Sequence, residues 1–154
     1  MSETESTVES VALPQKLATR EEIQEVMATQ RDLSEMDMRG MDLAGMKFTG
    51  IKMHKALLKD ADASSAMFAG ADMAESDLGG ADLTNAKFMG VNLAHGILRK
   101  AQMTAAKLMG VNLAHAEMHG ADLTNAQMMG TNMEGVDLSK ADLTAAKVVG
   151  SNFN

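Results

Sequence analysis

The sequence predicts an all-β solenoid preceded by one short helix. The pentapeptide VNLAH occurs twice, at residues 91–95 and again 20 residues later at 111–115. A large apolar residue recurs at every fifth position from Leu33 to Phe153, and glycine or asparagine recurs at the same interval. Repeats of constant length are the sequence signature of solenoids, because each unit buries its apolar face only by stacking on its neighbours.

The apolar frame is continuous and holds 25 successive units. Their central residues begin with Leu33, Met38, Leu43, Phe48, Met53 and Leu58, and only Ala63 among them is small. Two places before each centre stands a small or apolar residue such as Ala81 or Val91, and a polar residue separates the two. Side chains alternate along an extended segment, so the small and large residues point inward and the polar one points outward.

The last place of each unit predicts a corner in the chain. Glycine occupies positions 40, 45, 50, 70, 80, 90, 110, 120, 130, 135 and 150, and asparagine occupies 85 and 125. These residue types tolerate the positive φ that tight turns require. Each unit is therefore a three-residue strand followed by a two-residue corner. Four units make one coil, which places residue n next to residue n + 20 at about 4.8 Å.

The repeated units resemble those of a known family. Units such as ADLTN, SDLGG, VNLAH and ADLTA are similar to the A(D/N)Lxx consensus of the pentapeptide repeat family, over about four fifths of the chain. The resemblance implies a right-handed quadrilateral β-helix, a pentapeptide-repeat solenoid whose handedness and square section the spacing alone does not fix. Large residues depart from the consensus at Met36, Met41, Met46 and Ile51, and we expect them to fill a wider first coil.

The residues before the repeats form two short segments. Residues 1–18 are rich in Ser, Thr and Glu and include the sole proline, which predicts a flexible acidic tail. Thr19 and Glu22 have the spacing of a capping box, so a helix is predicted over residues 19–30. We expect this N-terminal capping helix to cover the first coil of the β-helix at residues 31–154, with a partner-binding helix as the alternative.

Composition excludes several classes of protein. The chain has 154 residues, no cysteine and no run of 18 apolar residues, and its first 30 residues are polar and acidic. The sequence therefore predicts no disulfide, no thiolate zinc site, no secretory signal and no membrane span, and a cytoplasmic location. No nucleophile, base and orienting acid stand together in the pattern, so we expect no enzyme and no cofactor. We also expect no direct contact with nucleic acid and no membrane attachment.

The outward residues form four columns, one on each side of the coil. The first side presents Asp42, Asp62, Asp82, Gln102, Asp122 and Asp142, and the second presents Lys47, Met67, Lys87, Lys107, Gln127 and Lys147. The third side presents Lys52, Asp72, Asn92, Asn112, Asn132 and Asn152, and the fourth presents Asp37, Leu57, Asp77, Ile97, Glu117 and Asp137. Stacked asparagines are expected to bond from rung to rung. Stacked aspartates repel one another, which the neighbouring lysines are expected to offset in part.

Two surface features and one interior feature are candidate sites. The candidate interaction surface consists of Met89, Met109 and Met129, which Val149 continues at the first corner position, together with Asp82, Asp122 and Asp142. An exposed apolar stripe usually marks a contact surface, and methionines that are merely tolerated at the surface are the alternative. The expected core stack includes Phe48, Phe68, Phe88, Leu93, Leu113 and Leu123.

Histidines form the second surface feature. His95 and His115 stand 20 residues apart, and Glu75 stands one rung before them. Adjacent imidazoles suit a borderline divalent metal ion. Stacked histidines are more often solvated corner residues, and we expect no metal site here.

These features predict a protein-interaction or structural scaffold. Some members of the pentapeptide repeat family imitate duplex DNA and bind DNA gyrase or topoisomerase IV, which is the alternative that the resemblance implies. Such mimicry needs a strongly negative rod. The chain carries a net charge of −7, but residues 1–30 hold more than half of it. The charge of the repeats therefore favours the scaffold.

The last coil predicts self-association. Leu138, Leu143, Val148 and Phe153 form its interior, and neither a helix nor a proline follows them in the sequence. Exposed strand edges and open apolar cores invite pairing. We expect an elongated homodimer joined through this coil, because twofold pairing covers both open faces at once.

Overall fold

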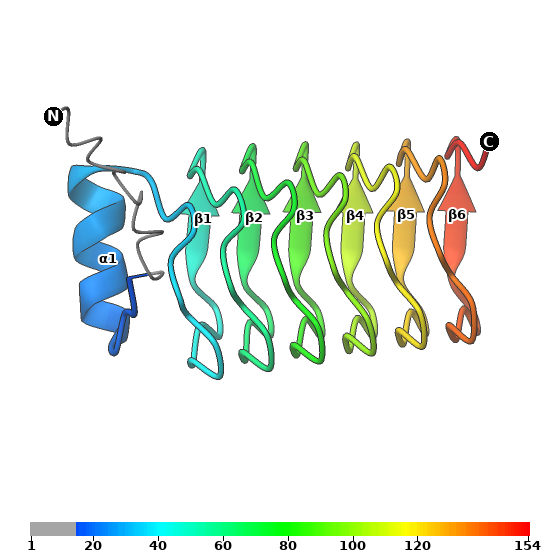
Figure 1. Ribbon diagram of the computed structural model, residues 1–154. Helices are drawn as coiled ribbons and strands as arrows, with labels where there is room; N and C mark the ends of the chain where they lie inside the picture. The colour runs from blue at the N-terminus through cyan, green and yellow to red at the C-terminus, as the bar shows by residue number, and fades with distance from the viewer. Residues whose placement is uncertain (1–14) are drawn as a thin grey trace, which may run out of the picture.

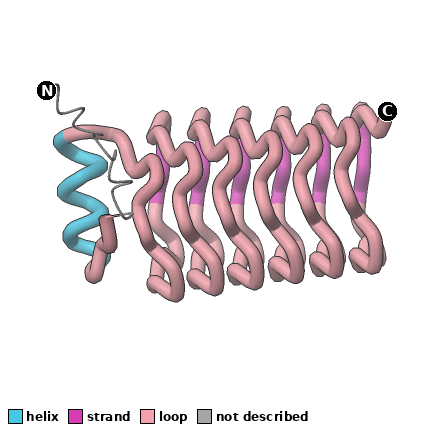
Figure 2. The backbone as a smooth tube through the Cα atoms, in the orientation of Figure 1, coloured by secondary structure: helices cyan, strands magenta, loops and turns pink. Residues whose placement is uncertain are grey.

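The computed structural model describes residues 15–154. Its six strands form one parallel sheet in chain order: β1 (Lys47–Thr49), β2 (Met67–Ala69), β3 (Lys87–Met89), β4 (Lys107–Met109), β5 (Gln127–Met129) and β6 (Lys147–Val149). Each strand pairs with the next at an offset of 20 residues, as in Phe48 with Phe68. The coils stack side by side, with α1 (Arg20–Thr29) at one end and the C-terminus at the other (Figures 1 and 2). This arrangement confirms the predicted β-helix.

The other three sides of the coil are also held by parallel pairing. Single bridges join Asp62 with Asp82, Asn92 with Asn112 and Asp77 with Ile97, one on each of these sides. On these sides the backbone N–H of the central residues from Leu33 to Met133 donates to the next coil, as in the 2.7 Å bond from Leu93 to the carbonyl of Asn112. The φ of every fifth residue from 35 to 150 is positive, so the predicted corners are present.

The second side differs from the predicted division into strand and corner. We expected Met89 to begin a corner, but it is the last residue of β3. Since Lys87 and Met89 lie two residues apart on one strand, both side chains leave the same outer face. The second side is therefore a six-stranded sheet with two outward columns, whereas each of the other sides carries one outward column and a turn.

The interior is one continuous cluster of apolar side chains from all four sides of the coil. The rings of Phe48, Phe68 and Phe88 stack at centroid distances of 4.9 Å. Leu93, Leu113 and Leu123 are likewise fully buried, so all six residues of the expected core stack lie inside. Parallel stacking of like side chains on successive rungs follows from the 20-residue offset and fixes the register, because a slip of one residue would turn every inward side chain outward.

The helix α1 covers the first coil. Thr19 caps it through the expected capping box with Glu22, and Ile23 is fully buried. Val26 and Met27 pack against the same core as Met36 and Met41, two of the large residues that depart from the consensus. The large side chains of the first coil therefore belong to the same apolar core against which the helix packs.

The N-terminal boundary differs from the prediction. Residues 1–14 of the expected tail lie outside the described residues. Lys16, however, pairs with Asp37, and Leu17 is buried in the core. The ladder therefore begins before residue 19. From residue 15 onward, no helix has the length and apolar character needed to cross a lipid bilayer.

Candidate functional site

The second side carries the most exposed apolar residues along the flank of the rod. Met89, Met109 and Met129 are 38%, 43% and 44% exposed, and Val149 is 63% exposed. These four residues, which we call the methionine stripe, occupy the third position of β3 to β6. Successive strands pair residue by residue, so the stripe is continuous along the stack.

A column of lysines runs beside the stripe. Lys47, Lys87, Lys107 and Lys147, the lysine column, occupy the first position of their strands and are exposed. Among residues 15–154, none of the four has a carboxylate within 4.0 Å. The second side presents no acidic residue at either outward position. It is therefore a positively charged and partly apolar surface on a chain whose net charge is negative.

The aspartates of the first side are satisfied by their own backbone. Thr84, Thr124 and Thr144 each donate a backbone hydrogen bond of 2.9 Å to the aspartate two residues earlier. Hydrogen bonds from Thr124, with the side-chain bond contributing most, lower the pKa of Asp122. Within the described chain no lysine of the second side forms an ion pair with these carboxylates, so the partial offset by the neighbouring lysines stays a prediction.

The predicted interaction surface is therefore not one patch. Asp82, Asp122 and Asp142 lie on the first side, and the methionine stripe lies at the far edge of the second. Along each coil the lysine column comes between them in the chain. The side chains beside the stripe on its own strands are therefore lysines and not aspartates. Sequence reasoning missed this juxtaposition because it treated the methionines as corner residues.

The third side forms the predicted asparagine ladder. Asn112 and Asn132 each donate a side-chain hydrogen bond of 3.2 Å to the asparagine one coil earlier. Asn92 ends the ladder, and its side-chain amide donates a hydrogen bond of 3.1 Å to the carboxylate of Asp72. The amide oxygens also accept backbone hydrogen bonds two residues along, as Ala114 donates to Asn112 at 3.1 Å. Each asparagine is thus bonded within the rod.

The two candidate histidines meet, but their expected acidic neighbour turns elsewhere. The rings of His95 and His115 stack with centroids 5.2 Å apart and planes inclined by 21°. Glu75 lies 3.6 Å from Lys55 and 3.8 Å from His54. Over the described range, no three His, Asp or Glu side chains gather in a way that could hold a metal ion. The corner at Gly135 leaves room for the ring of His115, which a Cβ there would strike.

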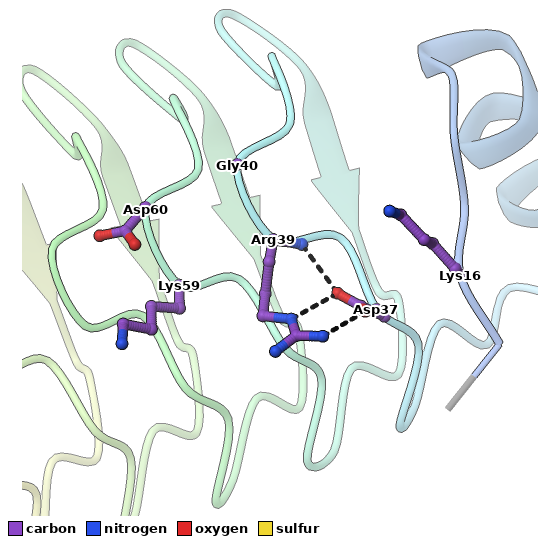
Figure 3. Close-up of a pocket in the computed structure, with 6 residues that line it drawn as sticks. All are labelled: Lys16, Asp37, Arg39, Gly40, Lys59 and Asp60. Carbon is purple, nitrogen blue, oxygen red and sulfur yellow. Dashed lines mark hydrogen bonds and ion pairs between the residues drawn. The ribbon is translucent and has the colours of Figure 1, made fainter. Parts of the chain in front are cut away.

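The fourth side holds two shallow pockets of mixed charge. The first, of about 440 Å³, is lined by Lys16, Asp37, Arg39, Gly40, Lys59 and Asp60. Figure 3 shows Arg39 turned onto Asp37, with its Nε at 2.8 Å and one terminal nitrogen at 2.7 Å from the two carboxylate oxygens. This bidentate bond is the main cause that lowers the pKa of Asp37 to about 2. These two charges satisfy each other and leave little for a ligand.

The second pocket, of about 620 Å³, lies farther along the fourth side. It is lined by Lys59, Asp60, Asp77, Gly79, Gly80, Ile97, Arg99, Lys100 and His119. Arg99, its central cation, pairs with Glu117 at 2.7 Å. Both basic and acidic side chains line the pocket, so the lining does not carry charge of one sign alone.

A histidine, a serine and an aspartate also meet on the fourth side, and sequence reasoning missed this group. His119 Nδ1 lies 2.7 Å from the hydroxyl of Ser139, one coil away. That hydroxyl donates a hydrogen bond of 2.6 Å to the carboxylate of Asp137. In a hydrolytic triad the aspartate orients the histidine, and the histidine accepts the proton of the serine. Here the serine hydroxyl donates its hydrogen bond to the aspartate and not to the histidine, so the histidine is not placed to accept the serine proton. The 20-residue spacing of His119 and Ser139 was the available signal.

The last coil exposes part of its interior. Leu143 is 36% exposed, Val148 is 37% exposed and Phe153 is 56% exposed, whereas Leu138 is partly buried. The corresponding central residues of earlier coils are almost all fully buried.

Comparison with known proteins agrees with this geometry. The family model of pentapeptide repeats matches residues 47–85, 86–125 and 116–154 in 8 copies. The chain belongs to the pentapeptide repeat family. No curated protein matches it significantly.

The chain is similar to several solved structures. The pentapeptide repeat protein Rfr23 from the cyanobacterium Cyanothece 51142 is 25% identical, with a TM-score of 0.62, and the match covers 88% of this chain and 100% of that one. HetL from the cyanobacterium Nostoc sp. strain PCC 7120, involved in heterocyst differentiation regulation, is 19% identical, with a TM-score of 0.58 and coverage of 90% and 81%. QnrB1, a plasmid-mediated fluoroquinolone resistance protein, is 16% identical, with a TM-score of 0.48 and coverage of 75% and 71%.

Proposed function

We propose that this protein is a non-enzymatic scaffold that binds other proteins through the second side of its β-helix. The observation that carries the proposal is the methionine stripe, an exposed apolar surface on rigid, paired strands. Contiguous apolar surface on a soluble protein usually marks a contact site. Methionine suits such a site because its unbranched side chain adapts to the shape of a partner.

The remaining polar groups support a scaffold more than a catalyst. The asparagine ladder and the aspartate turns are bonded internally, and the hydroxyl of Ser139 donates its hydrogen bond to Asp137. A nucleophile needs a base that accepts its proton.

A cytoplasmic location stays a prediction from the sequence.

Affinity capture tests the proposal. The folded protein is immobilised beside a variant in which Met89, Met109 and Met129 are changed to Thr, the residue that β1 already carries at this position. A second control changes Asn152 to Ser on the third side. We expect proteins that are retained by the unmodified chain and by the control but are lost with the threonine variant. Equal retention by all three baits would contradict the proposal.

We also propose that the 154-residue chain forms a homodimer through its last coil. The exposed Val148 and Phe153 support this proposal, because association would bury apolar surface that now faces water. Val148→Asp combined with Phe153→Asp is expected to give monomers or aggregates, and Met109→Asp to leave the dimer intact. Light scattering measures the mass. A monomer for the unmodified chain, or loss of the dimer in Met109→Asp, would show that the last coil is not the contact.

Gyrase binding by imitation of DNA is the second candidate, and the aspartate column of the first side favours it. The neighbouring lysine column opposes it, since duplex DNA is negative on every side. We expect no inhibition of gyrase supercoiling at low micromolar protein. Inhibition that weakens when Asp82, Asp122 and Asp142 are changed to Asn would establish the mimic instead.

A further inference from the structure

We infer that the second side binds an acidic amphipathic helix of a partner protein. This inference rests on the proposed scaffold function and specifies the chemistry of the partner. It depends on three features of the described residues: the exposed methionine stripe, the unpaired lysine column beside it, and the spacing of the coils. Each feature excludes some occupants of this surface.

The charge of the surface selects an acidic partner. Lys87 and Lys107 are neighbours on adjacent strands, so two like charges face solvent one rung apart. Like charges directly opposite each other in a sheet are destabilising. No carboxylate among residues 15–154 lies within 4.0 Å of either lysine. Carboxylates from a partner would relieve this repulsion, whereas a basic or neutral partner would not.

The spacing of the columns selects a helix. The rungs follow one another at about 4.8 Å, the distance between paired strands. The methionine stripe occupies four successive rungs, and in the lysine column Lys87 and Lys107 are on adjacent rungs, while Met67 and Gln127 stand between the other lysines. One turn of an α-helix advances about 5.4 Å, whereas same-face residues of an extended chain lie about 6.8 Å apart. A helix that lies along the stack therefore nearly matches the rungs. The mismatch over the three steps from Met89 to Val149 is about 2 Å, which flexible methionine side chains can absorb.

The corner beside the stripe leaves room for such a helix. Positions 50, 70, 90, 110, 130 and 150 next to the second side are all glycine. A Cβ built on Gly90, Gly110 or Gly130 would meet nothing within 4 Å. The edge of the stripe is therefore open, and a helix about 10 Å in diameter meets no side chain from this corner. Its apolar residues would lie on the methionines and its acidic residues on the lysines.

Fluorescence anisotropy with synthetic peptides tests the inference. The probe is a labelled, helix-forming peptide. Its leucines are spaced alternately three and four residues apart, so that they share one face of the helix, and glutamates lie along one edge of that face. A matched peptide carries Lys in place of Glu. We expect the Glu peptide to bind the full chain with an affinity that falls as salt rises. We expect the Lys peptide not to bind.

Matched variants assign the site. Lys87→Gln with Lys107→Gln is expected to weaken binding of the Glu peptide about tenfold, and Met89→Thr with Met109→Thr at least as much. Lys52→Gln with Lys59→Gln removes two lysines from other sides and should leave binding unchanged. Circular dichroism of each variant confirms that it is folded. Equal loss in the control pair would overturn the inference, as would equal binding of both peptides.

A third arm distinguishes a lipid surface from a protein. Lysines beside apolar side chains also suit anionic membranes. Binding to phosphatidylserine vesicles without binding to the Glu peptide would overturn the inference in favour of a membrane. If affinity capture retains proteins through the stripe but the Glu peptide does not bind, the scaffold stands and the helical partner is wrong. Failure of both experiments removes the two proposals together.

Discussion

The second and third sides of the β-helix are built on the same coils, yet they treat their outward groups in opposite ways. On the third side, each side-chain amide of Asn92, Asn112 and Asn132 donates to the rung before it. On the second side, the lysine column is unpaired within residues 15–154, and the methionine stripe faces solvent. The difference teaches that a column satisfied within the rod stabilises the fold, and a column left unsatisfied is available to a partner.

Both sides depend on one interior, and damage there has the largest expected effect. Phe88→Asp places a carboxylate in the ring stack, where it has no partner, and we expect the chain not to fold. Phe88→Leu is the matched control, since Leu108 occupies this place on the next rung. Circular dichroism and proteolysis measure the outcome. A folded Phe88→Asp protein would mean that the interior is not packed as described.

Substitution of one asparagine tests whether the ladder of the third side stabilises the fold. Asn112→Ala removes the bond to Asn92, the bond from Asn132 and the turn bond from Ala114. We expect a loss of about 1–3 kcal/mol in the free energy of unfolding. Gln102→Ala on the first side is the control, because the described residues supply its side chain with no hydrogen bond, and it should cost less than about 0.5 kcal/mol. Equal losses of free energy in the two variants would show that the asparagine ladder adds no stability beyond that of an unbonded surface side chain.

Substitutions at the corners between the sides are expected to change the free energy of unfolding by a smaller amount, with a sign that depends on whether glycine is gained or lost. Ala105 has a φ of 57° and Gly110 has a φ of 61°. A side chain in this region costs about 1 kcal/mol, which glycine avoids. We expect Ala105→Gly to raise the free energy of unfolding by about 0.5 kcal/mol and Gly110→Ala to lower it by a similar amount. Urea denaturation of the two variants checks both signs, and a stabilised Gly110→Ala would contradict the backbone argument.

The smallest expected effect concerns pH on the fourth side. The bond with Arg39 lowers the pKa of Asp37 to about 2. An aspartate with a lowered pKa stabilises the fold above its unfolded pKa of about 3.9, and this contribution is lost as pH falls towards the folded value. The melting temperature of the unmodified chain should therefore fall more between pH 4 and pH 2 than that of Asp37→Asn. Parallel pH profiles would show that the ion pair adds no stability.

The sequence predicted those parts of the molecule that a fixed interval determines. The interval of five residues identified the inward residues and the corners with positive φ, and the interval of 20 residues identified the stacking of the core residues and the asparagine ladder. It did not predict that Met89 lies in a strand beside Lys87, since all four sides of the pentapeptide pattern look alike in the sequence. Nor did it predict the contact of His119 with Ser139, which depends on side-chain orientation across two coils.

Equilibrium unfolding of two triple variants tests the contrast between the second and third sides most directly. One variant changes Met89, Met109 and Met129 to Thr, and the other changes Asn92, Asn112 and Asn132 to Ala. The methionine variant should keep the free energy of unfolding within about 1 kcal/mol of the unmodified chain, because these side chains are exposed at the surface. The asparagine variant should lose at least about 3 kcal/mol, because each rung loses a hydrogen bond. A stable asparagine variant beside an unfolded methionine variant would contradict the assignment of structure to the third side and of binding to the second.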